Sequence, residues 1–129
     1  MTNAAPPAAV QPRKVQRPWG YYDSIDVGAH HQVKRILVEP AGRLSLQSHA
    51  QRAEHWVVIA GIATITVDDK RADYSVGQHV FIPLGAKHRL ENLTNAPVEI
   101  IEVQIGAYLG EDDIVRYDDI YGRLPSQAS

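Results

Sequence analysis

The chain has 129 residues, 44% of them hydrophobic and 22% charged, which fits one packed domain and is too short for two ordinary ones. A formal net charge of −2 at pH 7 argues against duplex nucleic acid as a partner, although local basic residues can still bind a small anion. Because cysteine is absent, disulfides, thiolate nucleophiles and zinc–thiolate sites are excluded, and a metal would need His, Glu, Asp, Gln or water as ligands. The sequence has no apolar run of membrane-spanning length and does not start like a signal peptide, so we expect a soluble, cytoplasmic protein with no membrane partner.

Residues 1–15 are rich in Ala and Pro, which predicts a flexible leader before a domain over residues 16–124 and a loose tail over 125–129. Within the domain, short apolar runs are separated by Gly, Pro, Asp and Asn, a pattern typical of an antiparallel barrel or sandwich. The acidic start of the segment 110–123 predicts one or two helical turns. The expected strands cover residues 21–25, 32–39, 43–47, 55–59, 63–67, 79–82, 88–92 and 98–104.

Four metal-capable side chains fall in two turn-rich blocks, over residues 42–54 and 77–92. Since alternate residues of a strand share a face, His49 and Gln51 are expected to point into the barrel, with Arg52 pointing away. Glu54 breaks this phase, so it is expected to come round a turn onto the inner face of the next strand. His88 arrives from a separate strand. We therefore expect two imidazoles, one carboxylate and one amide oxygen around one divalent ion, with positions left for water or substrate.

The first block resembles the first cupin motif, in which a glycine precedes His-x-His, a glutamate and a second glycine. Gln51 stands where that motif usually has its second His. The second block resembles the second cupin motif and contains Gly77, Pro83-Leu84-Gly85, His88 and Asn92. The resemblance implies an all-β single cupin domain, a jelly-roll-like double-stranded β-helix that binds one divalent metal ion. Zinc is the first expectation, and manganese, cobalt, nickel and iron are alternatives. A neutral amide is a weaker ligand than imidazole, so Gln51 either coordinates the metal or hydrogen-bonds a metal-bound water.

Further motifs, spread over residues 17–123, resemble the isomerase domain of type II phosphomannose isomerases. In that family the cupin usually follows a nucleotidyltransferase domain. No Gly-rich nucleotide loop occurs here, which predicts a freestanding isomerase module. The resemblance implies interconversion of mannose 6-phosphate and fructose 6-phosphate. The motifs are Arg17-Pro18-Trp19-Gly20, Val33-Lys34-Arg35-Ile36, Leu46-Gln47 through Trp56, Ile82-Pro83 through Asn92, and Gly110-Glu111 through Arg116 with Tyr121-Gly122-Arg123.

Aldose–ketose isomerisation through an enediol needs an acid/base, stabilisation of charge on the oxygens and a group that binds the phosphate. Arginine suits phosphate because its planar guanidinium donates two hydrogen bonds at once, although these arginines can equally form surface ion pairs. The phosphate candidates are Arg17, Arg116 and Arg123. The candidate catalytic residues are Lys34, His55, Glu102 and Arg116.

Two other classes of function fit the same motifs. One is a non-catalytic or regulatory sugar-binding cupin with a degenerate metal site. The other is an oxygenase whose ferrous iron is bound by two His and one carboxylate. The flanking arginines favour a phosphosugar over the apolar substrate of an oxygenase. Exposed strand edges in so short a domain also predict a homodimer.

Overall fold

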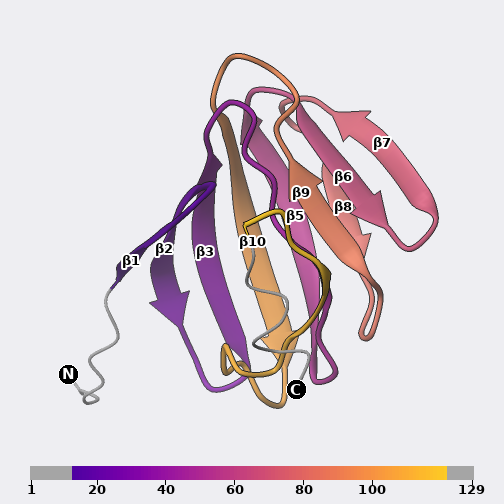
Figure 1. The fold of residues 1–129 in the computed structure, drawn as a ribbon. Coiled ribbons are helices and arrows are strands. Elements are labelled where there is room, and N and C mark those ends of the chain that lie inside the picture. The colour runs from indigo at the N-terminus through magenta and orange to yellow at the C-terminus, as the bar shows by residue number, and fades with distance from the viewer. Residues whose placement is uncertain (1–12, 122–129) are drawn as a thin grey trace.

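The computed structural model describes residues 13–121, which form eleven strands (Figure 1). Residues 1–12 and 122–129, with most of the expected leader, the tail and Arg123, lie outside the described residues. The strands are β1 Lys14–Arg17, β2 Gly20–Val27, β3 His31–Val38, β4 Leu46–Ser48, β5 Arg52–Ala60, β6 Ala63–Val67, β7 Lys70–Tyr74, β8 His79–Ile82, β9 His88–Glu91, β10 Val98–Gly106 and β11 Val115–Asp118.

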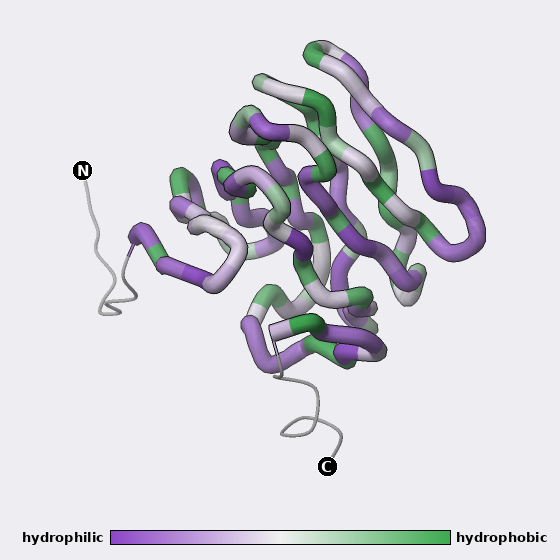
Figure 2. Tube along the Cα trace, turned by 45° about the horizontal axis from the view of Figure 1, so that its top comes forward, coloured by the Kyte–Doolittle hydropathy of each residue, from purple (hydrophilic) through white to green (hydrophobic). Residues whose placement is uncertain are grey.

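The strands form two antiparallel sheets that face each other. One sheet has the order β1-β2-β3-β10-β5-β8 and the other β11-β4-β9-β6-β7. Hydrophilic and hydrophobic residues alternate along the strands (Figure 2), because successive side chains point to opposite faces. The predicted all-β fold is therefore confirmed. The buried apolar core consists of Trp19, Ile36, Val38, Trp56, Val58, Ala63, Ile65, Ile82, Ala86, Leu90, Val98 and Ile100.

The inner face of the six-stranded sheet changes from apolar to charged along its strands. At one level Ile100 of β10 pairs with Ile36 of β3 and Val58 of β5, and all three are buried. Two residues further along β10, Glu102 pairs with Lys34 of β3, and both side chains are also buried. Burying charged groups costs free energy unless they are paired, so this end of the sheet is the place to look for a functional site.

Three strands were not expected from the sequence, namely β1, β7 and β11. Strand β1 begins at Lys14, inside the segment assigned to the leader. Strand β7 pairs with β6 through a tight turn at Asp68, where φ is 51°.

The predicted helical turns over 110–123 are wrong for the described part of that segment. Residues 115–118 form β11 instead, where Val115 pairs with Ser48 and Arg116 with Gln47 of β4. Two physical reasons favour the strand. Its β-branched and aromatic residues suit a sheet, and pairing satisfies backbone groups along β4 that would otherwise form an open edge. Among the described residues, no helix is long and apolar enough to cross a membrane.

Candidate functional site

A pocket opens between the two sheets at the charged end of the inner face. Its empty space is about 630 Å³, a volume that includes open solvent. Both sheets contribute to its wall, through residues on β1 to β5 and on β9 to β11. The lining residues are Arg17, Trp19, Tyr22, Lys34, Ile36, Leu44, Ser45, Gln47, His49, Arg52, Glu54, Trp56, His88, Arg89, Leu90, Glu102, Glu111, Ile114 and Arg116.

Three of the four predicted metal ligands meet in this pocket. Ligand atoms of His49, Glu54 and His88 all lie within 4.8 Å of one another, and all three residues are buried. His49 Nε2 lies 3.4 Å from Glu54 Oε2, and the two imidazole rings are 5.0 Å apart. His49 follows β4, Glu54 lies on β5 and His88 begins β9, so both sheets contribute to the cluster. This arrangement can hold a divalent metal ion.

The two imidazoles are in the form that metal binding requires. His49 Nδ1 lies 2.6 Å from the carbonyl oxygen of Asp113, and His88 Nδ1 lies 3.0 Å from that of Ala86. A carbonyl can only accept, so each Nδ1 carries the hydrogen and each Nε2 has a lone pair. Burial and the nearby Arg52 guanidinium lower the pKa of His49 to about 4, and burial lowers the pKa of His88. Both rings are therefore neutral at pH 7.

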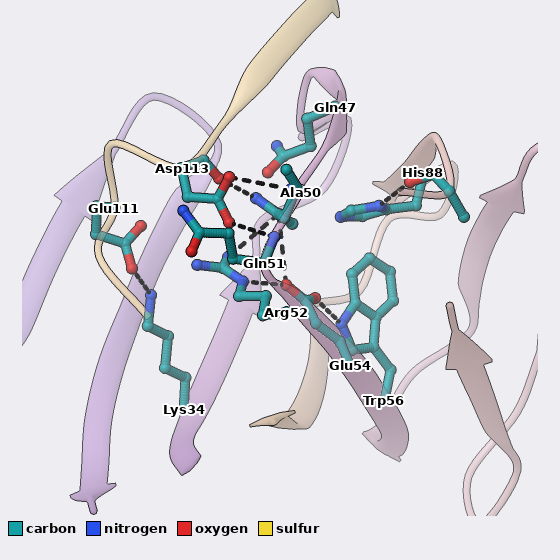
Figure 3. Close-up of polar contacts among 12 residues, drawn as sticks. Lys34, Gln47, Ala50, Gln51, Arg52, Glu54, Trp56, His88, Glu111 and Asp113 are labelled. Atoms are coloured by element: carbon teal, nitrogen blue, oxygen red, sulfur yellow. Dashed lines mark hydrogen bonds and ion pairs between the residues drawn. The ribbon is translucent and has the colours of Figure 1, made fainter. Parts of the chain in front are cut away.

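Glu54 is held on both carboxylate oxygens. Its Oε1 accepts a hydrogen bond from Trp56 Nε1 and its Oε2 accepts one from Arg52 Nε, each at 2.8 Å (Figure 3). Glu102 lies beside it on β10. Burial, the neighbouring Glu54 carboxylate and a hydrogen bond between the two raise the pKa of Glu102 to about 8. Glu102 is therefore a protonated acid at neutral pH.

The fourth predicted ligand, Gln51, is not brought into the pocket. It is exposed, and its backbone N–H donates to the Asp113 carboxylate at 2.9 Å (Figure 3). The parity argument failed because β4 ends at Ser48, so the chain is no longer extended at Gln51. Gln47 lines the pocket instead and pairs directly with His88. Its amide nitrogen donates to Ser45 Oγ at 2.9 Å, which leaves the amide oxygen available to a ligand or metal.

Among the substrate-binding candidates, the pocket includes Arg17 and Arg116, whereas Arg123 lies outside the described residues. His55, a predicted catalytic residue, is not part of the pocket. Its side chain is exposed on the opposite face of β5 and contacts Phe81, with ring centroids 4.7 Å apart. The physical reason is that His55 directly follows Glu54 on β5, and successive residues of a strand point to opposite faces.

Lys34 lies in the pocket wall with its side chain almost fully buried. Its Nζ donates to Glu111 Oε2 at 2.5 Å and lies 4.0 Å from the centre of the Tyr22 ring. Glu111 is half exposed and comes from the segment after β10, so this ion pair connects the pocket wall to the loop at its rim (Figure 3). Lys34 and Glu102 are thus neighbouring buried groups on adjacent strands.

Three residues that line or support the candidate site are not expected from the sequence: Gln47, Arg52 and Asp113. Asp113 supplies the carbonyl that orients His49, and its carboxylate accepts from the N–H groups of Ala50 and Gln51 at 3.0 and 2.9 Å. The sequence contains a signal for Gln47, because it lies two residues before His49 and alternate residues of a strand share a face. Arg52 was placed on the outer face, yet it is 5% exposed and contacts two of the metal-ligand candidates.

Comparisons with known proteins agree with this geometry. The chain is 58% identical over 111 residues to the xanthan biosynthesis protein XanB of Xanthomonas campestris pv. campestris (strain B100), covering 86% of this chain and 24% of XanB. The chain thus spans about a quarter of the length of the curated relatives it matches.

Solved structures show the same fold. The structure of oxalate decarboxylase from Bacillus subtilis, studied for its Mn(II) centres, superposes with a TM-score of 0.70 at 20% identity, over 81% of this chain and 30% of that one. A protein from Silicibacter pomeroyi DSS-3, described as a sugar phosphate isomerase from a cupin superfamily, superposes with a TM-score of 0.58 at 23% identity, over 65% and 59% of the two chains. The family described as "Mannose-6-phosphate isomerase C-terminal" matches residues 7–119. The chain therefore belongs to the mannose-6-phosphate isomerase C-terminal family, with a cupin fold.

Proposed function

We propose that this domain is a metal-dependent aldose–ketose isomerase that interconverts mannose 6-phosphate and fructose 6-phosphate. One observation carries the proposal. A single pocket collects a His–Glu–His cluster, a buried acid beside a buried lysine, and the two candidate phosphate-binding residues Arg17 and Arg116. Those are the three kinds of group that enediol chemistry on a phosphosugar needs. Membership of the family supports the choice of substrate.

The donor set fits a divalent metal. His49, Glu54 and His88 would hold it, with the amide oxygen of Gln47 as a fourth ligand from the neighbouring position on β4. Two nitrogen and two oxygen donors suit zinc, manganese, cobalt, nickel or iron. When bound, the metal would supply Lewis-acid polarisation of the sugar carbonyl and hydroxyl oxygens.

Glu102 and Lys34 are the proposed proton carriers. Both are buried, both line the pocket, and they pair across β10 and β3. A pKa of about 8 lets Glu102 hold a proton at neutral pH and release it at a small cost in free energy. A group that transfers protons between two carbons or their oxygens needs both properties. The lysine ammonium opposite would stabilise the carboxylate while the proton is away.

Arg17 and Arg116 are the proposed phosphate ligands. They enter the pocket from β1 and β11, strands at one edge of each sheet, so they lie apart in the sequence and meet only in the fold. Guanidinium groups bind phosphate with paired hydrogen bonds. A phosphate bound by the arginines would leave the sugar carbons to reach the metal and Glu102.

A coupled assay of mannose 6-phosphate conversion tests the proposal. Purified protein would be assayed with zinc, cobalt or manganese and after chelation, beside Glu54→Gln and the control His79→Gln, whose imidazole is exposed on β8. We expect metal-dependent turnover that Glu54→Gln abolishes and His79→Gln retains. Folded protein that shows no turnover with any of these metals would refute the isomerase proposal and favour a sugar-binding cupin.

A further inference from the structure

Arg52 contacts the same atoms that a metal would use. We propose that the Arg52 guanidinium is a built-in competitor of the metal, which holds the ligand cluster together and must leave His49 Nε2 before that atom can bind a metal. The inference rests on the proposed metal site. Its content is that Arg52 lowers the affinity of this site for metal. Arg52 is 5% exposed and is the first residue of β5, with its side chain beside Glu54 (Figure 3).

The contact between Arg52 and His49 is mutually exclusive with metal ligation by that histidine. Its Nη2 lies 3.2 Å from His49 Nε2, and its Nε donates to Glu54 Oε2 at 2.8 Å. His49 Nδ1 already donates to the Asp113 carbonyl, so Nε2 has the ring's one lone pair. That lone pair cannot accept a hydrogen bond from Arg52 and bind a metal at the same time.

Electrostatics make the competition strong. A guanidinium bonded to two of the three ligands places a full positive charge at a few ångströms from the centre of the cluster. Repulsion between that charge and a divalent ion is not screened by salt in a buried site. Without a metal, the same charge offsets the cost of burying the Glu54 carboxylate, and that carboxylate raises the pKa of Arg52.

The environment of Arg52 also offers a route for release. Its Nη1 is buried and makes no hydrogen bond with any described residue, so the guanidinium is not held on all sides. The carboxylate of Glu111, half exposed at the pocket rim, attracts the arginine from outside the cluster. A rotation of the Arg52 side chain toward Glu111 would free His49 Nε2 and move the positive charge away from Glu54, while keeping the guanidinium paired.

Calorimetric titration of the chelated protein with zinc tests this idea, using wild type, Arg52→Gln, Arg52→Lys and the control Arg35→Gln. Arg35 lies on β3 and pairs with Glu99 and Asp23 outside the pocket, so its substitution removes one positive charge without touching the cluster. We expect Arg52→Gln to bind zinc on the order of tenfold or more tightly. The lysine variant should fall between, because an ammonium keeps the charge but lacks the planar guanidinium geometry that contacts His49 and Glu54 together. Arg35→Gln should match wild type.

A second measurement needs no variant. In ¹⁵N-labelled wild-type protein, the Nε–H signal of Arg52 should be protected from exchange without zinc and should shift as zinc is added. Unchanged or weaker zinc binding by both Arg52 variants, or an Arg52 signal that zinc leaves unmoved, would overturn the competition while leaving the metal site intact. Absence of zinc binding by wild type and every variant would refute the metal site itself, and the competition with it. Both readouts are independent of isomerase activity.

Discussion

Replacing Glu102 with Gln should change how the stability of the metal-free protein depends on pH. Glu102 is buried beside Glu54, and its pKa is raised to about 8. Between pH 4.5 and 8 the folded protein therefore holds a proton on Glu102 that the unfolded chain has released. Because the unfolded state binds fewer protons over this range, the free energy of unfolding falls as the pH rises. Glutamine cannot ionise, so the variant lacks this decrease.

The size of the effect follows from the same values. Raising a pKa from 4.5 to about 8 corresponds to roughly 5 kcal/mol, at about 1.4 kcal/mol for each tenfold change in proton affinity. The stability of Glu102→Gln relative to wild type should thus increase by several kcal/mol between pH 5 and pH 9. Near pH 5 the two proteins should differ by about 1 kcal/mol or less, since a neutral amide replaces a neutral acid of similar shape.

Urea unfolding in the presence of a chelator, at pH 5, 7 and 9, measures this difference. The lowered pKa values of His49 and His88 add their own pH dependence, and Glu102 is one of the charges that act on both rings. The comparison therefore relies chiefly on pH 7 and 9, where both rings are neutral in the folded protein. Glu99→Gln is the matched control, because Glu99 lies on the same strand and pairs with Arg35 on the outer face. A stability difference between Glu102→Gln and wild type that stays constant with pH would refute the raised pKa, and with it the case for Glu102 as a proton carrier at neutral pH.

Four other substitutions test the rest of the site. Asp113→Ala removes the acceptor of two backbone N–H groups and loosens the loop that orients His49, so zinc affinity measured by calorimetry should fall roughly 10- to 100-fold. Gln47→Ala should weaken zinc binding in the same titration while Gln51→Ala should not, and the reverse result would restore Gln51 as the ligand. Arg116→Gln should raise KM for mannose 6-phosphate about tenfold or more with a smaller change in kcat, and an unchanged KM in the coupled assay would reject a role in phosphate binding.

Much of the site could be predicted because its ligands are tied to local sequence patterns. His49, Glu54 and His88 each sit at a fixed place in a motif, and strand parity correctly placed Glu54 on the inner face of β5. The same rule correctly separates His55 from Glu54, since neighbours on a strand point to opposite faces.

What failed depended on where strands end and what they pair with. Parity was counted from His49 through Gln51 to Arg52, but β4 stops at Ser48 and β5 starts at Arg52, so the count restarts there. The tail was misread for a related reason. The carboxylate of Asp113, expected to favour a helix start, instead accepts N–H groups of the β4–β5 turn. Neither feature is visible without the tertiary partner, because the local sequence is compatible with both outcomes.

The charged end of the inner face has a consequence for stability as well as for chemistry. Lys34, Glu54 and Glu102 each lie two residues away, on the same strand, from a residue of the apolar core: Ile36, Trp56 and Ile100 respectively. Ion pairs between Lys34 and Glu111 and between Glu54 and Arg52 offset part of the desolvation free energy of these buried groups. A ligand that binds only the folded state stabilises it in proportion to its affinity. A metal and a phosphosugar should therefore raise the melting temperature together, with the metal replacing the arginine as the partner of Glu54.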